Sequence, residues 1–467
     1  MPSSPQGKGG IGVSGGSLRP GTTFVTTSSI AMLPTGPRAC PFWSLSSARV
    51  ASLSLVVAAS AFSTSCRPHS HLLEQDDARA SSTDFASASL PPYHPPPPLD
   101  DGWSVARADA VGMSVEKLGA MERAIRAGDF PKLTSVAIAR HGKLVYEAYF
   151  SETDGGTLHN TRSVTKTVTG MLLGIAIEKG FVAGVDAPVV SFFPDMRPLA
   201  NPDPRKEAIT LEDFLTMSSA LECNDGEDDS RGNEERMYVE KDWVKFTLHL
   251  PVRKPDGKDG GPRIDRRDGG PRAESVEAGN ADRGRRFSYC TAGVGTLGGV
   301  IERATKTPLA EFANAVLFAP LGIDRATWRY SPVGLAFTGG GLELKSRDLL
   351  KLAELYLDGG TWKGARVIAE SWVSRSVQPH ATFVAGPPLF RVDDKTEYGY
   401  LWWLRSFSAN GKTWPVWFMS GNGGNKVVIV PELRLVAVLS SVNYNAKGMH
   451  LATERLLQEH VLAAVID

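Results

Sequence analysis

Two hairpin patterns near opposite ends of the chain constrain its fold more than any other feature of the sequence. In the first, the apolar segments 135–140 and 143–149 flank His141-Gly142, a pair typical of a tight turn between strands. The second consists of the β-branched segments 426–430 and 434–440. Most of the sequence between the two patterns has helical spacing. We therefore expect an α+β fold of the broad α/β class, in which an antiparallel sheet is built from both chain ends and flanked by helices, with a helical lobe inserted in the middle.

Apolar residues spaced three and four apart predict the helices. The expected helices cover residues 114–127, 164–179, 208–217, 292–304, 308–317, 346–357 and 449–465. Together with the hairpins they place the folded body at residues 106–467, which is long enough for a large core.

The residues before that body predict an export signal and a linker. Residues 1–66 consist of a disordered, Gly- and Ser-rich start and then the 13-residue apolar run Val50–Phe62. As a helix this run is about 20 Å long, shorter than the roughly 30 Å hydrocarbon core of a bilayer, so we interpret it as a signal segment and not as a membrane-spanning helix. Residues 67–105 are rich in Pro and Ser and predict an extended linker. We therefore expect an exported protein, either periplasmic or anchored to a membrane as a lipoprotein.

The anchor would be Cys66, which follows small residues as in a lipoprotein processing site, although Ser63 stands where leucine is usual. A lipid on Cys66 would tether the protein to a membrane. An ordinary secretory signal, or a cysteine with no role, is the alternative. Cys223 and Cys290 could form a disulfide in an oxidising compartment or could be two buried free thiols.

The charge balance argues against nucleic-acid binding. The chain has 51 basic and 51 acidic side chains, so no overall positive field attracts a polyanion. Residues 253–286 carry ten basic and seven acidic side chains and few large apolar ones, and the interleaved signs predict a solvated, flexible insertion rather than a basic nucleic-acid patch. No pair of His or Cys in the folded body has metal-ligand spacing, so we expect neither a metal nor an organic cofactor.

Ser163-Val-Thr-Lys166 at the start of a strongly apolar helix is the sequence feature with the clearest chemistry. A spacing of three places both side chains on one helical face. The positive end of the helix dipole stabilises an oxyanion near Ser163, and apolar surroundings lower the pKa of a lysine until it can accept a proton. A nucleophile and its base are therefore predicted. The alternative is a helix cap followed by a surface lysine, which this short pattern also fits.

Several longer segments resemble the serine beta-lactamase-related family. The resemblance covers about residues 115–465 and is carried by Arg162–Lys166, Leu173–Gly180, Asp186–Val189, Thr210–Ser218, Phe318–Ile323, Asp348–Ala353 and Tyr398–Trp403. This family includes class C beta-lactamases, D-alanyl-D-alanine carboxypeptidases, D-aminopeptidases, family VIII esterases and 6-aminohexanoate oligomer hydrolases. The resemblance implies a beta-lactamase/transpeptidase-like fold.

The resemblance also implies roles for two motifs. Ser163 is the expected acyl-accepting nucleophile and Lys166 the base that activates it. The second motif, normally Tyr-x-Asn, corresponds to Tyr289-Cys290-Thr291. Tyr289 is the expected proton relay to the leaving group. Thr291 replaces an amide that contacts the substrate, which puts substrate positioning in doubt and leaves the acid/base chemistry intact.

The third motif, normally Lys-Thr-Gly or His-x-Gly, corresponds to Met419-Ser420-Gly421, followed by Asn422. The resemblance implies that the backbone amides of Ser163 and Asn422 form the oxyanion hole. Met419 removes the cation that holds a substrate carboxylate. Tyr289 and Met419 could also be ordinary core residues.

These observations predict a serine hydrolase that acts through an acyl-enzyme on a small-molecule ester or uncharged amide. A D,D-peptidase or a beta-lactamase is the alternative among enzymes. A non-catalytic, penicillin-binding-protein-like sensor or binding module is the alternative of another class. Gly339-Gly-Gly341 could line the substrate site or form a tight turn.

Overall fold

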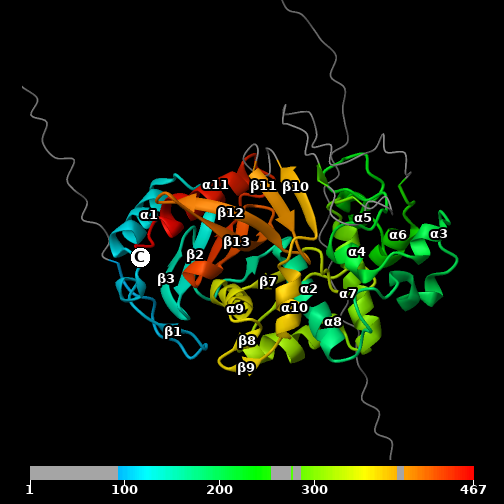
Figure 1. Ribbon diagram of the computed structural model, residues 1–467, viewed down its shortest axis with the longest axis horizontal. Coiled ribbons are helices and arrows are strands. Elements are labelled where there is room, and N and C mark those ends of the chain that lie inside the picture. Colours follow the sequence, from blue (N-terminus) through cyan, green and yellow to red (C-terminus); the bar gives the residue numbers. More distant parts are fainter. Residues whose placement is uncertain (1–92, 254–274, 277–285, 386–393, 467) are drawn as a thin grey trace, which may run out of the picture. The chain divides into compact units, whose positions relative to one another are not determined.

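The computed structural model describes residues 93–253, 275–276, 286–385 and 394–466 (Figure 1). The signal segment, the lipidation of Cys66 and most of the linker lie outside these residues, as does most of the 253–286 insertion. In the described ranges, no helix is long and apolar enough to cross a bilayer.

A ten-stranded sheet forms the centre of the described fold, in the order β1-β3-β2-β15-β14-β13-β12-β11-β10-β5. Its strands are β1 (Ser104–Val105), β2 (Leu133–Arg140), β3 (Lys143–Tyr149), β5 (Ser275–Val276), β10 (Ala381–Ala385), β11 (Asp394–Tyr398), β12 (Trp403–Ala409), β13 (Lys412–Gly421), β14 (Asn425–Val430) and β15 (Leu435–Ser441). Neighbouring strands are antiparallel except β1 and β3, which are parallel. The pairing of β2 with β15 joins the two chain ends, as the hairpin patterns predict.

Helices cover both faces of this sheet, which explains why every residue of β2, β14 and β15 is buried. Figure 1 shows α1 and α11 on one side, with α2 and α9 on the other. The helices are α1 (Val115–Ala127), α2 (Val164–Glu178), α3 (Pro204–Glu207), α4 (Leu211–Leu215), α5 (Glu234–Tyr238), α6 (Trp243–His249), α7 (Thr291–Thr305), α8 (Leu309–Ala313), α9 (Ser346–Leu357), α10 (Glu370–Ser376) and α11 (Met449–Leu456).

Short elements connect these parts. They are the 3-10 turns η1 (Asp109–Val111), η2 (Val189–Phe192), η3 (Pro194–Met196), η7 (Ala319–Leu321) and η8 (Pro431–Leu433), the π-helical turns η6 (Asn314–Phe318) and η9 (Leu457–Leu462), and the small strands β4 (His159–Asn160), β6 (Thr327–Trp328), β7 (Leu342–Leu344), β8 (Thr361–Trp362) and β9 (Ala365–Arg366). The two expected helices at 308–317 and 449–465 each end in such a π-helical turn.

The expectation of mainly helical structure between the two hairpins is wrong for the last part of that region. Strands β10 to β13 precede β14 and widen the sheet. The turn between β12 and β13 is Asn410-Gly411, and both residues have positive φ, 52° and 75°. Asn-Gly is a strong hairpin signal because these two residues tolerate left-handed backbone, so the sequence contained the evidence for this hairpin.

The folded body also begins earlier than residue 106. Trp103 is buried in the core, and the Tyr93 hydroxyl donates to the carbonyl of Val145 at 2.6 Å. Strand β1 then pairs with β3. The last part of the Pro-rich segment is therefore packed on the sheet, because its aromatic side chains have apolar surface to bury.

Candidate active site

Ser163 and Lys166 lie at the N-terminus of α2, as predicted. Ser163 is the N-cap residue and is half-buried, while Lys166 is 1% exposed. The Lys166 Nζ donates to Ser163 Oγ at 3.0 Å and to the carbonyl of Gly339 at 2.5 Å. The second contact places the Gly339–Gly341 segment against the site. The lysine is therefore a buried partner of the serine and not a surface residue after a helix cap.

Burial lowers the pKa of Lys166, because the ammonium form loses its hydration. The negative charges of Glu234 and Asp225 act in the opposite direction. No carboxylate in the described part of the chain forms an ion pair with Lys166, so desolvation is the stronger effect. A lysine in this environment can accept a proton from the neighbouring hydroxyl.

Tyr289 faces Lys166 from the segment before α7. The Lys166 Nζ lies 5.1 Å from the centre of the Tyr289 ring, and that ring stacks on Trp403 at 5.8 Å. Burial raises the pKa of Tyr289, and a hydrogen bond with Ser163 only partly offsets this effect. Tyr289 is therefore a neutral phenol near neutral pH, which suits a proton donor better than a base.

The end of β13 approaches the start of α2 closely enough to require glycine at position 421. A Cβ on Gly421 would lie 2.3 Å from the carbonyl oxygen of Thr161 and 3.3 Å from the amide nitrogen of Ser163. Asn422 follows directly. Within the described residues, neither the Ser163 amide nor the Asn422 amide donates a hydrogen bond to another group. These two N–H groups are therefore available to an oxyanion, as the resemblance implies.

Three other predicted binding residues have side chains that are buried or bonded to other parts of the protein. Met419 is fully buried, and the Ser420 hydroxyl accepts a hydrogen bond from Lys426 Nζ at 3.0 Å. The Asn422 side chain bonds to Asn445 through both its amide and its carbonyl oxygen. Packing in the sheet accounts for Met419 and Ser420, whose side chains alternate between its two faces. The side chains of Ser420 and Asn422 are thus already engaged within the protein.

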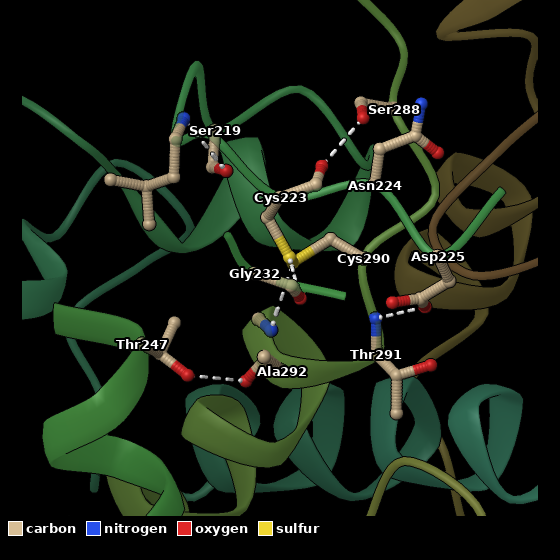
Figure 2. Close-up of a disulfide and its surroundings, with 12 residues drawn as sticks. Ser219, Cys223, Asn224, Asp225, Gly232, Thr247, Ser288, Cys290, Thr291 and Ala292 are labelled. Carbon is tan, nitrogen blue, oxygen red and sulfur yellow. Dashed lines mark hydrogen bonds between the residues drawn. A yellow bond between two sulfur atoms is a disulfide. The ribbon is translucent and has the colours of Figure 1, made fainter. Parts of the chain in front are cut away.

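A disulfide joins Cys223 to Cys290, with a Cα–Cα distance of 5.5 Å (Figure 2). It lies next to Tyr289 and ties that residue to the segment after α4. Two hydrogen bonds reinforce the link: the Asp225 amide donates to the carbonyl of Tyr289 at 2.9 Å, and the Ser288 hydroxyl donates to the carbonyl of Cys223 at 2.6 Å.

Asp225 is a residue of the site that the sequence analysis missed. Its carboxylate accepts from the amide of Thr291 at 2.7 Å (Figure 2). It also accepts from the amide of Glu234 at 3.0 Å. Burial and the charge of Glu234 raise the pKa of Asp225, while the charge of Lys166 lowers it. The only signal in the sequence is its place two residues after a cysteine. Thr291 itself is 1% exposed and contributes its backbone to this contact.

No group of three or more His, Cys, Asp or Glu residues in the described ranges could hold a metal ion. The site is built from a serine, a lysine, a tyrosine and backbone amides.

A family model described as Beta-lactamase matches residues 121–460, which include every site residue above. The chain belongs to the beta-lactamase family. Within it, the chain is 26% identical over 233 residues to a 6-aminohexanoate-dimer hydrolase of Paenarthrobacter ureafaciens. The match covers 49% of this chain and 52% of the relative, so the chain spans about half the length of that curated relative.

Solved structures of other proteins share the fold. A penicillin-binding protein homologue from Caulobacter crescentus has a TM-score of 0.52 and 16% identity, covering 75% of this chain and 99% of that one. EstCE1, a hydrolase with promiscuous acyltransferase activity, has a TM-score of 0.52 and 16% identity, covering 75% and 98%. The beta-lactamase/transpeptidase-like fold is confirmed, and the chain is a member of a family of hydrolases.

Proposed function

We propose that this protein is a serine hydrolase that forms an acyl-enzyme at Ser163 with a small ester or uncharged amide. The observation that carries the proposal is the 3.0 Å hydrogen bond between Ser163 Oγ and the Nζ of a fully buried lysine. Burying a lysine that has no ion-pair partner among the described residues lowers the stability of the fold. Such a residue is a candidate for function, and here it could act as the base that removes the proton of the nucleophile.

The reaction follows from the geometry. Neutral Lys166 takes the proton from Ser163 while Oγ forms a bond with the carbonyl carbon, and the N–H groups of Ser163 and Asn422 hold the oxyanion. As the oxyanion collapses, the bond to the leaving group breaks, and the leaving oxygen or nitrogen takes the proton of the Tyr289 phenol. Lys166 returns a proton to Tyr289. Water then attacks the acyl-enzyme by the reverse sequence of proton transfers and releases the acid.

The substrate preference rests on Met419. This apolar side chain is fully buried at the position where the resemblance implies a cation. A substrate carboxylate would find no partner there, which disfavours penicillins and anionic peptide ends. The likeness to a 6-aminohexanoate-dimer hydrolase supports an amide substrate, and the likeness to a hydrolase with promiscuous acyltransferase activity supports acyl transfer.

We also propose that the protein is exported to the periplasm, with Cys66 as a lipid anchor. The apolar run Val50–Phe62 and the Cys223–Cys290 disulfide support this location, because disulfides persist in oxidising compartments. Cell fractionation of the wild type and Cys66→Ser tests it. Release of the variant from the membrane fraction is expected, and a cytosolic wild type contradicts export.

The chemistry is tested by intact-mass measurement of the full chain after treatment with a fluorophosphonate or a p-nitrophenyl ester. We expect an adduct on the wild type and none on Ser163→Ala. A folded wild type without an adduct would overturn the proposal and favour the non-catalytic binding module.

A further inference from the structure

The segment after α4 reaches the active site through Asp225, and nothing in the three motifs accounts for this residue. Asp225 is followed by Gly226 and three further acidic residues, which are half-buried or exposed. Its own carboxylate points inward, toward the start of α7 (Figure 2). The reason for an acid at this position therefore lies in its contacts.

Asp225 forms hydrogen bonds with three parts of the chain. Its two carboxylate oxygens accept from the first amides of two helices, Glu234 of α5 and Thr291 of α7. Its own amide donates to the carbonyl of Tyr289. The disulfide, two residues earlier in the chain, ties the same segment to Cys290. Asp225 therefore cannot move without moving the residues on both sides of Cys290.

The charged and titratable groups around Asp225 come from three elements. Glu234 and Tyr238 lie on α5, Lys166 lies on α2, and Tyr289 precedes α7. Of these, Lys166 is the only cation. Tyr238 donates its hydroxyl to Glu234 at 3.0 Å, which keeps that second carboxylate beside Asp225.

We propose that Asp225 is a positioning residue of the active site, which holds Tyr289 in place and supplies the negative charge that stabilises Lys166 after it takes the proton of Ser163. This inference rests on the proposed function, because the proton transfer is the step that it serves. A positive charge develops on a desolvated lysine during that transfer, and a fixed carboxylate nearby lowers its energy. Neutral partners such as Ser163 and the Gly339 carbonyl cannot supply this charge.

The direction of the effect can be worked out. A negative charge favours the ammonium form and so raises the pKa of Lys166; the charge of Glu234 and, to a smaller extent, that of Asp225 act in this way here, against the larger effect of desolvation. Asp225→Asn keeps one acceptor oxygen and removes the charge. We expect the midpoint of the Lys166 titration to fall by about one pH unit. We also expect kcat/KM for a p-nitrophenyl ester to fall about 10-fold to 100-fold at its optimum, with its acid limb shifted to lower pH.

The experiment follows the 13Cε chemical shift of Lys166 against pH in the full chain, with the signal assigned by its loss in Lys166→Met. Wild type, Asp225→Asn and Asp242→Asn are compared. Asp242 is the matched control. Its carboxylate caps α6 by accepting a hydrogen bond from the backbone amide of Lys245 at 2.9 Å, and it lies outside the site. A lower midpoint in Asp225→Asn alone is expected, and an unchanged midpoint in that variant overturns the proposal.

Two features keep the test decisive. The chemical shift of Lys166 does not depend on turnover. A wild type without an acyl adduct would contradict the proposed function, and the titration would still test the effect of Asp225 on Lys166. If Asp225→Asn does not fold, the 13Cγ shift of Asp225 in the wild type replaces it. Coupled groups each show an inflection at the midpoint of the other. Independent single-step titrations of Asp225 and Lys166 would then contradict the proposal.

Discussion

Two buried lysines of this protein form the same hydrogen bond in different surroundings. Lys166 on α2 donates to Ser163 Oγ, and Lys426 on β14 donates to Ser420 Oγ, both at 3.0 Å. Lys166 is 1% exposed and Lys426 3%. By hydrogen bond and burial alone, either serine could be the nucleophile.

The groups around each pair separate them. Lys426 lies 3.4 Å from Glu454 of α11, and Glu454 also pairs with Arg405 at 3.0 Å. This cluster is closed between the sheet and α11. Lys166 instead has no ion-pair partner among the described residues: it bonds to Ser163 and the Gly339 carbonyl and faces the Tyr289 ring, and the charges of Glu234 and Asp225 only partly offset its desolvation. A Ser–Lys pair is therefore structural when its charge is neutralised in place, and suited to catalysis when the charge can appear and disappear.

The largest expected effect separates the two lysines by activity. Lys166→Met should lower kcat/KM for a p-nitrophenyl ester by about 10³-fold, because the base is lost. Its stability should be unchanged or higher, since an unpaired buried ammonium is replaced by an apolar side chain. Lys426→Met is the matched control, with an expected change of less than about 10-fold. Equal losses of activity in both variants would contradict this division of roles.

The second prediction concerns the cluster around Lys426. Glu454→Gln removes the buried carboxylate that pairs with both Lys426 and Arg405. We expect a loss of about 3–5 kcal/mol in the free energy of unfolding, measured by urea denaturation. Glu459→Gln, on the exposed end of the same C-terminal segment, should change stability by less than about 0.5 kcal/mol. A small loss of stability in Glu454→Gln would contradict a structural role for the cluster around Lys426.

The third prediction concerns the Cys223–Cys290 disulfide, which lies beside Tyr289. Cys223→Ser with Cys290→Ser should lower the free energy of unfolding by about 2–4 kcal/mol, because the bond closes a loop with a sequence separation of 67 residues. Hydrogen exchange should become faster at the amides of Asp225 and Thr291 and remain unchanged in β14. Equal acceleration in both regions would show that the disulfide stabilises the whole fold rather than the site.

The smallest expected effect is a pH dependence of stability. Burial lowers the pKa of Lys426 to about 8, against about 10.4 in the unfolded chain. The folded state then binds fewer protons than the unfolded state between these values, so this group makes the protein more stable as pH rises from 8 to 10. We expect the wild type to gain about 1–3 kcal/mol relative to Lys426→Met over this range, measured by urea denaturation. A parallel pH profile of the two proteins would argue against a depressed pKa.

Much of the fold could be predicted from local patterns. The helix expected at 114–127 corresponds to α1, Val115–Ala127. The Ser114 side chain caps this helix by accepting a hydrogen bond from the backbone amide of Lys117 at 3.1 Å. The hairpin at His141-Gly142 was predicted because both residues adopt positive φ readily. The Asn410-Gly411 hairpin had the same signal and was missed, since the neighbouring strands are rich in Trp and Ser and do not alternate regularly.

The site was predicted in part. Ser163, Lys166 and Tyr289 are brought together by α2 and the segment before α7, and the backbone of Gly421 and Asn422 lies beside them. Asp225 could not have been found, because its role depends on two helices that begin at residues 234 and 291.

The sequence by itself determined most helices, the two terminal hairpins, the order of the three motifs and the Ser163–Lys166 pair, because these depend on neighbours a few residues apart in the chain. Tertiary structure decided which of two Ser–Lys pairs faces the Tyr289 phenol and which is closed in the core. It also decided that Met419 is fully buried, that Ser420 bonds to Lys426, and that Asp225 contacts Thr291 and Tyr289. The physical reason is that burial and electrostatic environment are set by residues far apart in the sequence, and only the folded chain brings those residues within a few ångströms of one another.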